Sequence, residues 1–212
     1  MRVGYGWDSH EFKRGVPLRI GGVGIAHPKG LAGHSDGDVL LHALTDALLG
    51  ALAAGDIGSY FPPSDAQWKG ANSALFVQAA MGQVRREGYS VANVDSTLIL
   101  AAPKIGPHAA RIQGRIAQLL DVDPTAVGVK AKTPEGLGTD NAAIAHVVVL
   151  LVKKAGKRSR KIAVAEVVPQ PVIDSVAEKL VESVAEPTPS RKPAKSLAAS
   201  GASTRPKPAR RR

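Results

Sequence analysis

Four residues near the N-terminus have side chains that can bind a metal ion. Asp8 and His10 lie in Gly-Trp-Asp-Ser-His, and His34 and His42 bound the segment His-Ser-Asp-Gly-Asp-Val-Leu-Leu-His. Because alternate residues of an extended strand point to the same side, Asp8 and His10 can face one ion together. A carboxylate with two imidazoles suits zinc and leaves a fourth position open, as a catalytic metal requires. The pattern predicts a zinc site made by Asp8, His10 and His42.

The third ligand lies on a predicted helix over residues 38–52. Asp38, His42 and Asp46 are spaced four residues apart, so they form one polar stripe on an otherwise apolar helix. The stripe contains no Lys, Arg or Glu, which usually cover exposed helix surfaces, so we expect it to face a cleft or the interior. There Asp46 could orient an imidazole, and Asp38 suits the first turn because of the helix dipole.

Three loops are candidates for binding a phosphorylated substrate. Residues 101–107, Ala-Ala-Pro-Lys-Ile-Gly-Pro, join a predicted strand to a predicted helix, where backbone amides and a lysine can bind an anion. Residues 130–136, Lys-Ala-Lys-Thr-Pro-Glu-Gly, add a carboxylate that suits an oxygen-preferring cation such as magnesium. Residues 55–65 can bind substrate hydroxyls. Each loop is also compatible with an ordinary turn.

The first 152 residues alternate predicted strands with predicted helices. We expect strands at 2–7, 91–101, 127–131 and 142–152, two short strands around a Gly-Gly turn within 18–25, and helices at 38–52, 72–87 and 107–120. This order predicts a single α/β domain of the α+β layer type, with helices packed on a mixed sheet.

The net charge of +10 is confined to the C-terminal segment. Residues 1–152 contain 13 Lys and Arg against 13 Asp and Glu, whereas residues 153–212 contain 15 against 5. We therefore divide the chain into a folded domain at 1–152 and a basic Pro/Ser/Ala-rich tail at 153–212. We expect this tail to be disordered, except for a short helix at 172–184.

Composition excludes some classes of site. The chain has no cysteine, so disulfides and thiolate metal sites are impossible, and any metal must be held by histidines and carboxylates. Nothing resembles a signal peptide, and no apolar stretch is long enough to span a bilayer. We expect a cytoplasmic protein with no membrane partner.

Taken together, these motifs resemble the 2-C-methyl-D-erythritol 2,4-cyclodiphosphate synthases of the non-mevalonate isoprenoid pathway. The resemblance covers residues 1–152. It rests on the two metal-binding segments and on Gly-Asp-Ile-Gly, Phe-Pro-Pro-Ser-Asp, Asn-Val-Asp-Ser-Thr, Ala-Pro-Lys and Val-Lys-Ala-Lys-Thr-Pro-Glu. It implies a cyclising phosphorus–oxygen lyase: the 2-phosphate of a cytidine-diphosphate-linked methylerythritol attacks the β-phosphate, and CMP leaves.

The resemblance also implies roles for individual residues. It places zinc on Asp8, His10 and His42, a magnesium or manganese ion on Glu135, and transition-state stabilisation on His34 and Thr133. It implies a homotrimer with active sites between subunits. The substrate-binding residues that it implies are Asp8, His10, His34, Ser35, Asp56, Gly58, Phe61, Asp65, Ala101, Ala102, Pro103, Lys104, Gly106, Lys132, Thr133 and Glu135.

Two other functions stay open on the residues alone. A zinc-dependent phosphohydrolase would use the same three ligands to activate water. The basic tail could bind nucleic acid nonspecifically through its phosphates, although it has no aromatic residues on which bases would stack.

Overall fold

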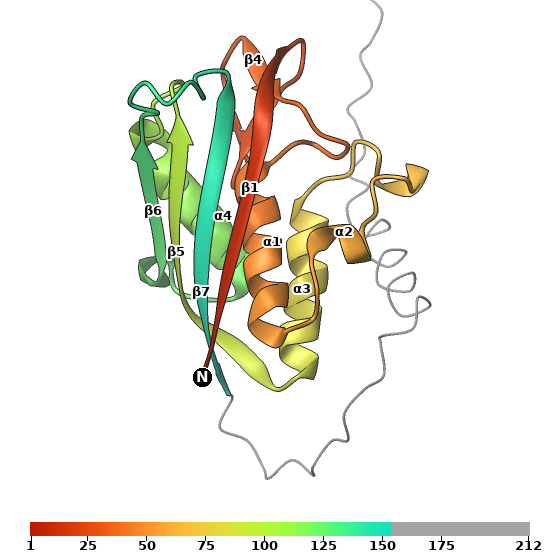
Figure 1. Cartoon of the computed structure of the whole chain (residues 1–212). Coiled ribbons are helices and arrows are strands. Elements are labelled where there is room, and N and C mark those ends of the chain that lie inside the picture. The colour runs from red at the N-terminus through yellow and green to blue at the C-terminus, as the bar shows by residue number, and fades with distance from the viewer. Residues whose placement is uncertain (154–212) are drawn as a thin grey trace, which may run out of the picture.

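The structure is a computed structural model and describes residues 1–153 of the chain. The predicted tail helix at 172–184 and the predicted disorder of the tail lie outside these residues. Within them, five strands form one sheet in the order β4–β1–β7–β5–β6 (Figure 1). The sheet is mixed, because β5 and β6 run parallel while the other neighbouring strands run antiparallel. Its strands are β1 (Arg2–Arg14), β4 (Lys29–Leu31), β5 (Tyr89–Leu100), β6 (Val127–Lys132) and β7 (Ala142–Lys153).

Three helices pack on one face of this sheet, which confirms the predicted layer architecture (Figure 1). They are α1 (Val39–Leu52), α3 (Ala74–Arg86) and α4 (Ala109–Leu120). Helix α1 lies between the sheet and α3, so apolar residues cover most of its circumference. None of the described helices is long and apolar enough to cross a membrane.

Shorter elements connect these layers. The predicted pair of strands around a Gly-Gly turn is present as β2 (Leu18–Ile20) and β3 (Val23–Ile25). The short helix α2 (Ile57–Tyr60) and strand β4 were not predicted, because segments of three or four residues are too short to show a periodicity. Three single 3₁₀ turns complete the described chain, at Ala66–Trp68, Gly106–His108 and Pro124–Ala126.

Strand β1 is longer than the predicted 2–7. It pairs with β7 as far as Glu11 and then with β4 from Phe12 to Arg14. Residues 8–14 contain charged side chains that disfavour strands, but neighbouring strands supply hydrogen-bond partners that outweigh this preference. Asp8 and His10 therefore both lie within one continuous strand.

Helix α1 packs directly on the backbone of β1. Built on Gly4 and Gly6, a Cβ atom would lie 1.9 Å from the carbonyl oxygens of Ala47 and Ala43 respectively. Only glycine leaves room for this approach. The contact brings His42, one residue before Ala43, next to the side chains that β1 directs toward the helices.

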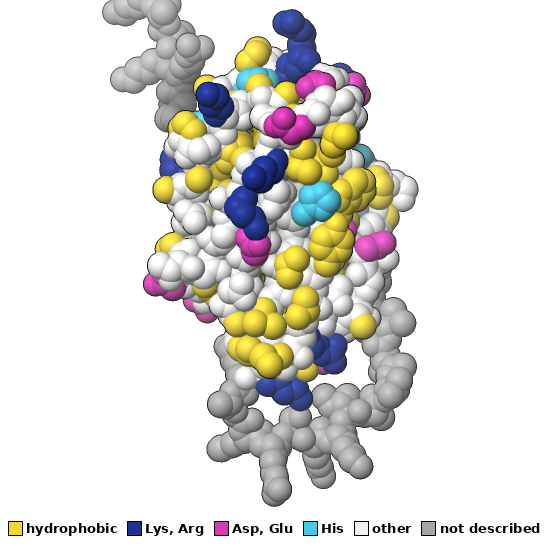
Figure 2. All heavy atoms as spheres, turned by 60° about the vertical axis from the view of Figure 1, so that its left-hand side comes forward, with side chains coloured by type: hydrophobic (Ala, Val, Ile, Leu, Met, Phe, Trp, Pro, Cys, Tyr) yellow, Lys and Arg dark blue, Asp and Glu magenta, His cyan; other side chains and the backbone are white. Residues whose placement is uncertain are grey.

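The other face of the sheet is not covered by described elements. Val3, Tyr5, Trp7 and Val148 are between 43% and 67% exposed, and all lie on neighbouring strands β1 and β7. Figure 2 shows hydrophobic side chains gathered with a histidine and a few charged groups on the side of the molecule that it brings forward. An apolar face of this kind is typical of a protein–protein interface.

Candidate functional site

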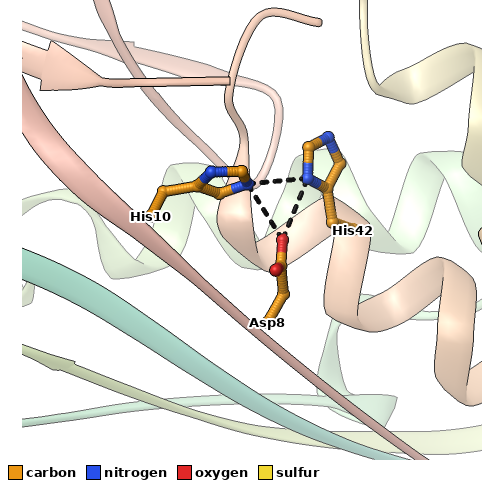
Figure 3. A group of neighbouring side chains, drawn as sticks. All are labelled: Asp8, His10 and His42. Atoms are coloured by element: carbon orange, nitrogen blue, oxygen red, sulfur yellow. Dashed lines mark hydrogen bonds and ion pairs between the residues drawn. The ribbon is translucent and has the colours of Figure 1, made fainter. Parts of the chain in front are cut away.

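Asp8, His10 and His42 point toward one another (Figure 3). The Oδ2 atom of Asp8 lies 2.9 Å from His10 Nε2 and 3.0 Å from His42 Nδ1, and these two nitrogens are 2.9 Å apart. Asp8 and His10 on β1 and His42 on α1 are thus brought together, and each of the three side chains offers one ligand atom to a common point.

This donor set fits a divalent metal. Ligand atoms arranged tetrahedrally around zinc at about 2.0–2.1 Å lie about 3.3–3.4 Å apart, so the three atoms need to separate by only a few tenths of an ångström. One oxygen and two nitrogens match the ligand preference of zinc. Three protein ligands leave further positions for a substrate oxygen.

Two mutually opposed effects act on the pKa of Asp8. Burial alone would raise it, but hydrogen bonds and charge from His10 and His42 outweigh burial, so the pKa of Asp8 lies well below its ordinary value. For His10, burial would lower the pKa, and the hydrogen bond and charge of Asp8 raise it above its ordinary value. The carboxylate therefore stays ionised and available to a cation over the physiological pH range.

Asp8, His10 and His42 form a triangle of side chains, and hydrogen bonds to other residues orient each of them. Asp8 Oδ1 accepts a hydrogen bond from the Ser9 backbone N–H at 2.8 Å, which leaves Oδ2 facing the imidazoles. The backbone of Ala32 hydrogen-bonds His10. His42 Nε2 lies 2.9 Å from Ser35 Oγ and 2.8 Å from Ser73 Oγ.

The prediction that Asp46 orients an imidazole is wrong. Asp46 Oδ1 instead accepts a hydrogen bond from the Ile57 backbone N–H at 2.7 Å and so fixes the start of α2. Asp46 lies on the same face of the helix as His42. It is one turn further along, however, so its carboxylate contacts the segment that begins α2 rather than the imidazole. Burial raises the pKa of Asp46 above its ordinary value, although the bond from Ile57 opposes this.

Asp38 anchors the start of α1. Its carboxylate is fully buried and accepts hydrogen bonds from the backbone N–H groups of Leu41, Gly21 and Gly22 at 3.1, 2.8 and 2.6 Å. Burial raises its pKa above the ordinary value, and the three N–H donors oppose that effect. The residue therefore caps the helix, just before its first turn, and also ties it to the β2–β3 turn.

A pocket of about 270 Å³ adjoins the triangle. Of the residues predicted from sequence, seven line it: Asp8, His10, His34, Ser35, His42, Gly58 and Phe61. His34 Nε2 donates a hydrogen bond to the backbone oxygen of Asp65 at 3.3 Å, which joins this loop to the 61–65 segment. Asp56 lies at the edge of the same region, where its side chain accepts hydrogen bonds from the N–H and hydroxyl of Ser59 at 2.8 and 2.6 Å.

The pocket also has an aromatic wall, of which Phe61 was predicted from the sequence and Trp68 and Phe76 were not. Phe61 stacks on Phe76 with ring centroids 4.4 Å apart, and Trp68 meets Phe61 edge-on at 5.1 Å. The sequence signal for this wall was the scarcity of aromatic residues. The chain has only eight of them, and Phe61, Trp68 and Phe76 come from separate segments. Ile57 and Pro63 complete the apolar lining.

The remaining predicted residues lie elsewhere in the described chain. Loop 101–106 and loop 132–135 follow the carboxyl ends of the parallel strands β5 and β6. Leu100, the last residue of β5, and His10 both pair with Ala143 of β7, so β7 separates the 101–106 loop from the metal ligands. Thr133 Oγ1 donates a hydrogen bond to Glu135, and both residues are exposed. The members of this group are Ala101, Ala102, Pro103, Lys104, Gly106, Lys132, Thr133 and Glu135.

Comparisons with known proteins show which family the chain matches. A family model described as the YgbB family matches residues 1–153. A 2-C-methyl-D-erythritol 2,4-cyclodiphosphate synthase from Koribacter versatilis (strain Ellin345) is 66% identical over 154 residues, covering 73% of this chain and 99% of the relative. The chloroplastic synthase of Arabidopsis thaliana is 49% identical over 157 residues, covering 73% of this chain and 68% of the relative.

Solved structures are similar as well. A 2C-methyl-D-erythritol-2,4-cyclodiphosphate synthase matches with a TM-score of 0.68 at 42% identity, covering 71% of this chain and 100% of that one. A synthase described as the CDP-bound form matches with a TM-score of 0.68 at 41% identity, with the same coverage.

Proposed function

The chain belongs to the YgbB family, and from this premise we propose that it converts 4-diphosphocytidyl-2-C-methyl-D-erythritol 2-phosphate to 2-C-methyl-D-erythritol 2,4-cyclodiphosphate and CMP. An oxygen of the 2-phosphate forms a bond to the β-phosphorus, and the bond from that phosphorus to the oxygen bridging the α-phosphate breaks. CMP departs with that oxygen. The observation that carries the proposal is the Asp8–His10–His42 triangle beside a pocket in a chain 66% identical to a named synthase.

The residues of the pocket suit this intramolecular transfer. The attacking phosphate is already an anion, so the reaction needs positioning and charge neutralisation more than a general base. His34 and Ser35 lie beside the triangle, where they would donate hydrogen bonds to phosphate oxygens. The aromatic wall would shield the carbon skeleton of methylerythritol from water, and Gly58 and Asp65 would border it.

We assign zinc to Asp8, His10 and His42, and magnesium or manganese to Glu135. Zinc bound there would act as a Lewis acid on a phosphate oxygen. Glu135, with Thr133 and Lys132, would meet the diphosphate from the cytidine side, and the 101–106 loop would hold the nucleoside. A hard oxygen ligand on an exposed loop suits a cation shared with phosphate oxygens.

We further propose a homotrimer in which neighbouring subunits complete each active site. The free sheet face with Tyr5, Trp7 and Val148 supports this assembly, because exposed apolar side chains on adjacent strands favour association. Its second support is the separation within one subunit of the metal ligands from the 101–106 and 132–135 loops. A neighbouring subunit would bring its own copy of those loops to the metal ligands.

The test of the site assignment is His42→Ala. The variant should lose both stoichiometric zinc and CMP release, because it removes one of three ligands. Zinc content is measured by atomic emission, and CMP by chromatography. A variant that retains one zinc per chain at this site would refute the ligand assignment, whereas loss of zinc with unchanged CMP release would refute the role of zinc in the reaction.

A further inference from the structure

A buried serine connects the metal-ligand histidine to a carboxylate. Ser73 Oγ lies 2.8 Å from His42 Nε2 and donates a hydrogen bond to Asp36 Oδ1 at 2.5 Å. Ser73 is fully buried, and its two contacts reach 31 and 37 residues back along the chain. The line Asp36–Ser73–His42 therefore ends at the nitrogen opposite the one that faces Asp8 and His10.

The Ser73 side chain does not cap the helix that Ser73 begins. It is the N-cap residue of α3, where a serine side chain ordinarily accepts a hydrogen bond from the first turn of the helix. Here it makes no such bond, and Asn72 Oδ1 accepts from the Ala74 backbone N–H instead. The hydroxyl is thus directed away from the helix that it begins and toward His42.

Backbone hydrogen bonds hold the two halves of the line together. The Gly70 N–H donates to the His34 carbonyl at 2.8 Å, and the Asp36 N–H donates to the Ala71 carbonyl at 2.9 Å. The loop that carries Asp36 is therefore fastened to the segment that leads into Ser73. The contact does not depend on side chains alone.

When Asp36 is ionised, only one assignment of hydrogen-bond donors fits the contacts between Asp36, Ser73 and His42. An ionised carboxylate can only accept, so the single proton of the Ser73 hydroxyl goes to Asp36. Ser73 Oγ then has only lone pairs for His42, and His42 Nε2 must carry the ring proton. The lone pair of neutral His42 is consequently on Nδ1, the atom that lies among the other metal ligands.

We propose that Asp36 and Ser73 are positioning residues for the metal centre, which fix the tautomer and ring orientation of His42. This inference rests on the proposed metal site. Ser35 Oγ also lies 2.9 Å from His42 Nε2, but its other partners are a second hydroxyl and the Gly37 N–H rather than a carboxylate. Within residues 1–153, only Ser73 joins His42 to a carboxylate acceptor.

The experiment compares zinc affinity in wild type, Ser73→Ala, Asp36→Ala and the double variant. Removing a residue that hydrogen-bonds a metal-binding histidine typically weakens metal affinity by about 10–100-fold. The zinc affinity of each single variant, measured in competition with a chromophoric chelator, should therefore fall at least tenfold. Because the two residues act in series, the double variant should lose little more than Ser73→Ala. Unchanged affinity in both single variants, or losses that multiply in the double variant, would overturn the proposal.

A second readout needs neither zinc nor turnover. In metal-free Asp8→Ala, which lacks the carboxylate that would otherwise favour a proton on Nδ1, the imidazole ¹⁵N shifts of His42 should report a protonated Nε2 and an unprotonated Nδ1 at about pH 8. Adding Ser73→Ala should mix the two tautomers, while adding the matched control Ser35→Ala, which removes a hydroxyl from the same nitrogen, should not. An Asp8→Ala variant with the His42 proton on Nδ1 would refute the assignment, even if zinc binding itself failed for another reason.

Discussion

Asp8 is the residue on which the charge of the metal centre depends. It is the only acidic member of the triangle, and its Oδ2 atom contacts both imidazoles. Without a metal, the same contacts make the carboxylate an acceptor for protonated histidine. The metal-free protein therefore has a pH dependence that can be predicted from the direction of the two pKa shifts.

In metal-free protein, Asp8→Asn should lower the free energy of unfolding more at about pH 5.5 than at about pH 9. The lowered pKa of Asp8 contributes stability above 3.8, its value outside the fold, and loses it as pH falls further. The raised pKa of His10 contributes stability that is fully present below 6.5 and is lost as pH rises through the folded value. Denaturant unfolding at both pH values measures the difference, with the exposed Asp140→Asn as control. An equal loss at both values would contradict the pairing.

Glu135→Gln tests the second cation. Zinc content should stay at the wild-type level, because Glu135 lies outside the triangle, while turnover should fall by about tenfold or more. Added magnesium or manganese should stimulate the wild type more than the variant. Glu87→Gln, an exposed carboxylate at the end of α3, serves as control. Equal stimulation of Glu135→Gln and wild type would remove Glu135 from this role.

Single residues were predictable where a short spacing determined the geometry. Asp8 and His10 lie two apart on a strand, and His42 lies on a strongly apolar helix, so their convergence could be expected. Ser73 could not be found in this way, because its partners are more than 30 residues distant and its local position suggested only a helix cap.

Among the elements, α1 and β1 form the contact that assembles the site. Helix bounds were predictable to within two residues at each end, since Asp38 caps α1 and Gly88 follows α3. The extent of β1 was not predictable, because its polar half is held by pairing with β7 and β4 rather than by its own propensity. Close approach of α1 to Gly4 and Gly6 also depends on tertiary packing.

Gly6→Ala tests this contact. The added methyl group would overlap the Ala43 carbonyl oxygen, so we expect a loss of about 3 kcal/mol or more in the free energy of unfolding, together with weaker zinc binding. Gly24→Ala on β3 is the matched control, because no atom lies within 4 Å of its Cβ position, and its change should stay within about 0.5 kcal/mol. Thermal and denaturant unfolding measure both. Similar stability of the two variants would show that α1 can move away without loss.

At the scale of the whole molecule, we expect the uncovered face of β1 and β7 to be the surface through which subunits associate. Val148→Glu places a charge opposite Tyr5 on that face, where the side chain is 43% exposed in the single subunit. The subunit should keep its fold by circular dichroism but dissociate from the proposed trimer, and turnover should fall with it if each active site is shared between two subunits. Light scattering measures the mass. A trimer that survives this change would exclude the face as the interface.

Residues 154–212 lie outside the family match, and we predict that they are dispensable for catalysis. Every proposed site residue lies before β7, whose last residue is Lys153. Truncation after residue 156 should therefore leave the trimer and its turnover nearly unchanged, while any salt-sensitive binding of nucleic acid should be lost. A turnover loss above about tenfold, or about 1.4 kcal/mol of barrier, would place the boundary of the domain further along the chain.

The proposed reaction is an intramolecular cyclisation, in which no water takes part. The most direct measurement incubates the zinc-loaded full-length protein with 4-diphosphocytidyl-2-C-methyl-D-erythritol 2-phosphate in ¹⁸O-labelled water and analyses the products by mass. Cyclisation predicts CMP and the cyclic diphosphate in equal amounts, with no solvent oxygen in either. An uncyclised methylerythritol 2,4-bisphosphate that carries ¹⁸O, or CMP that carries ¹⁸O, would show that water is the nucleophile and that the chain is a phosphohydrolase.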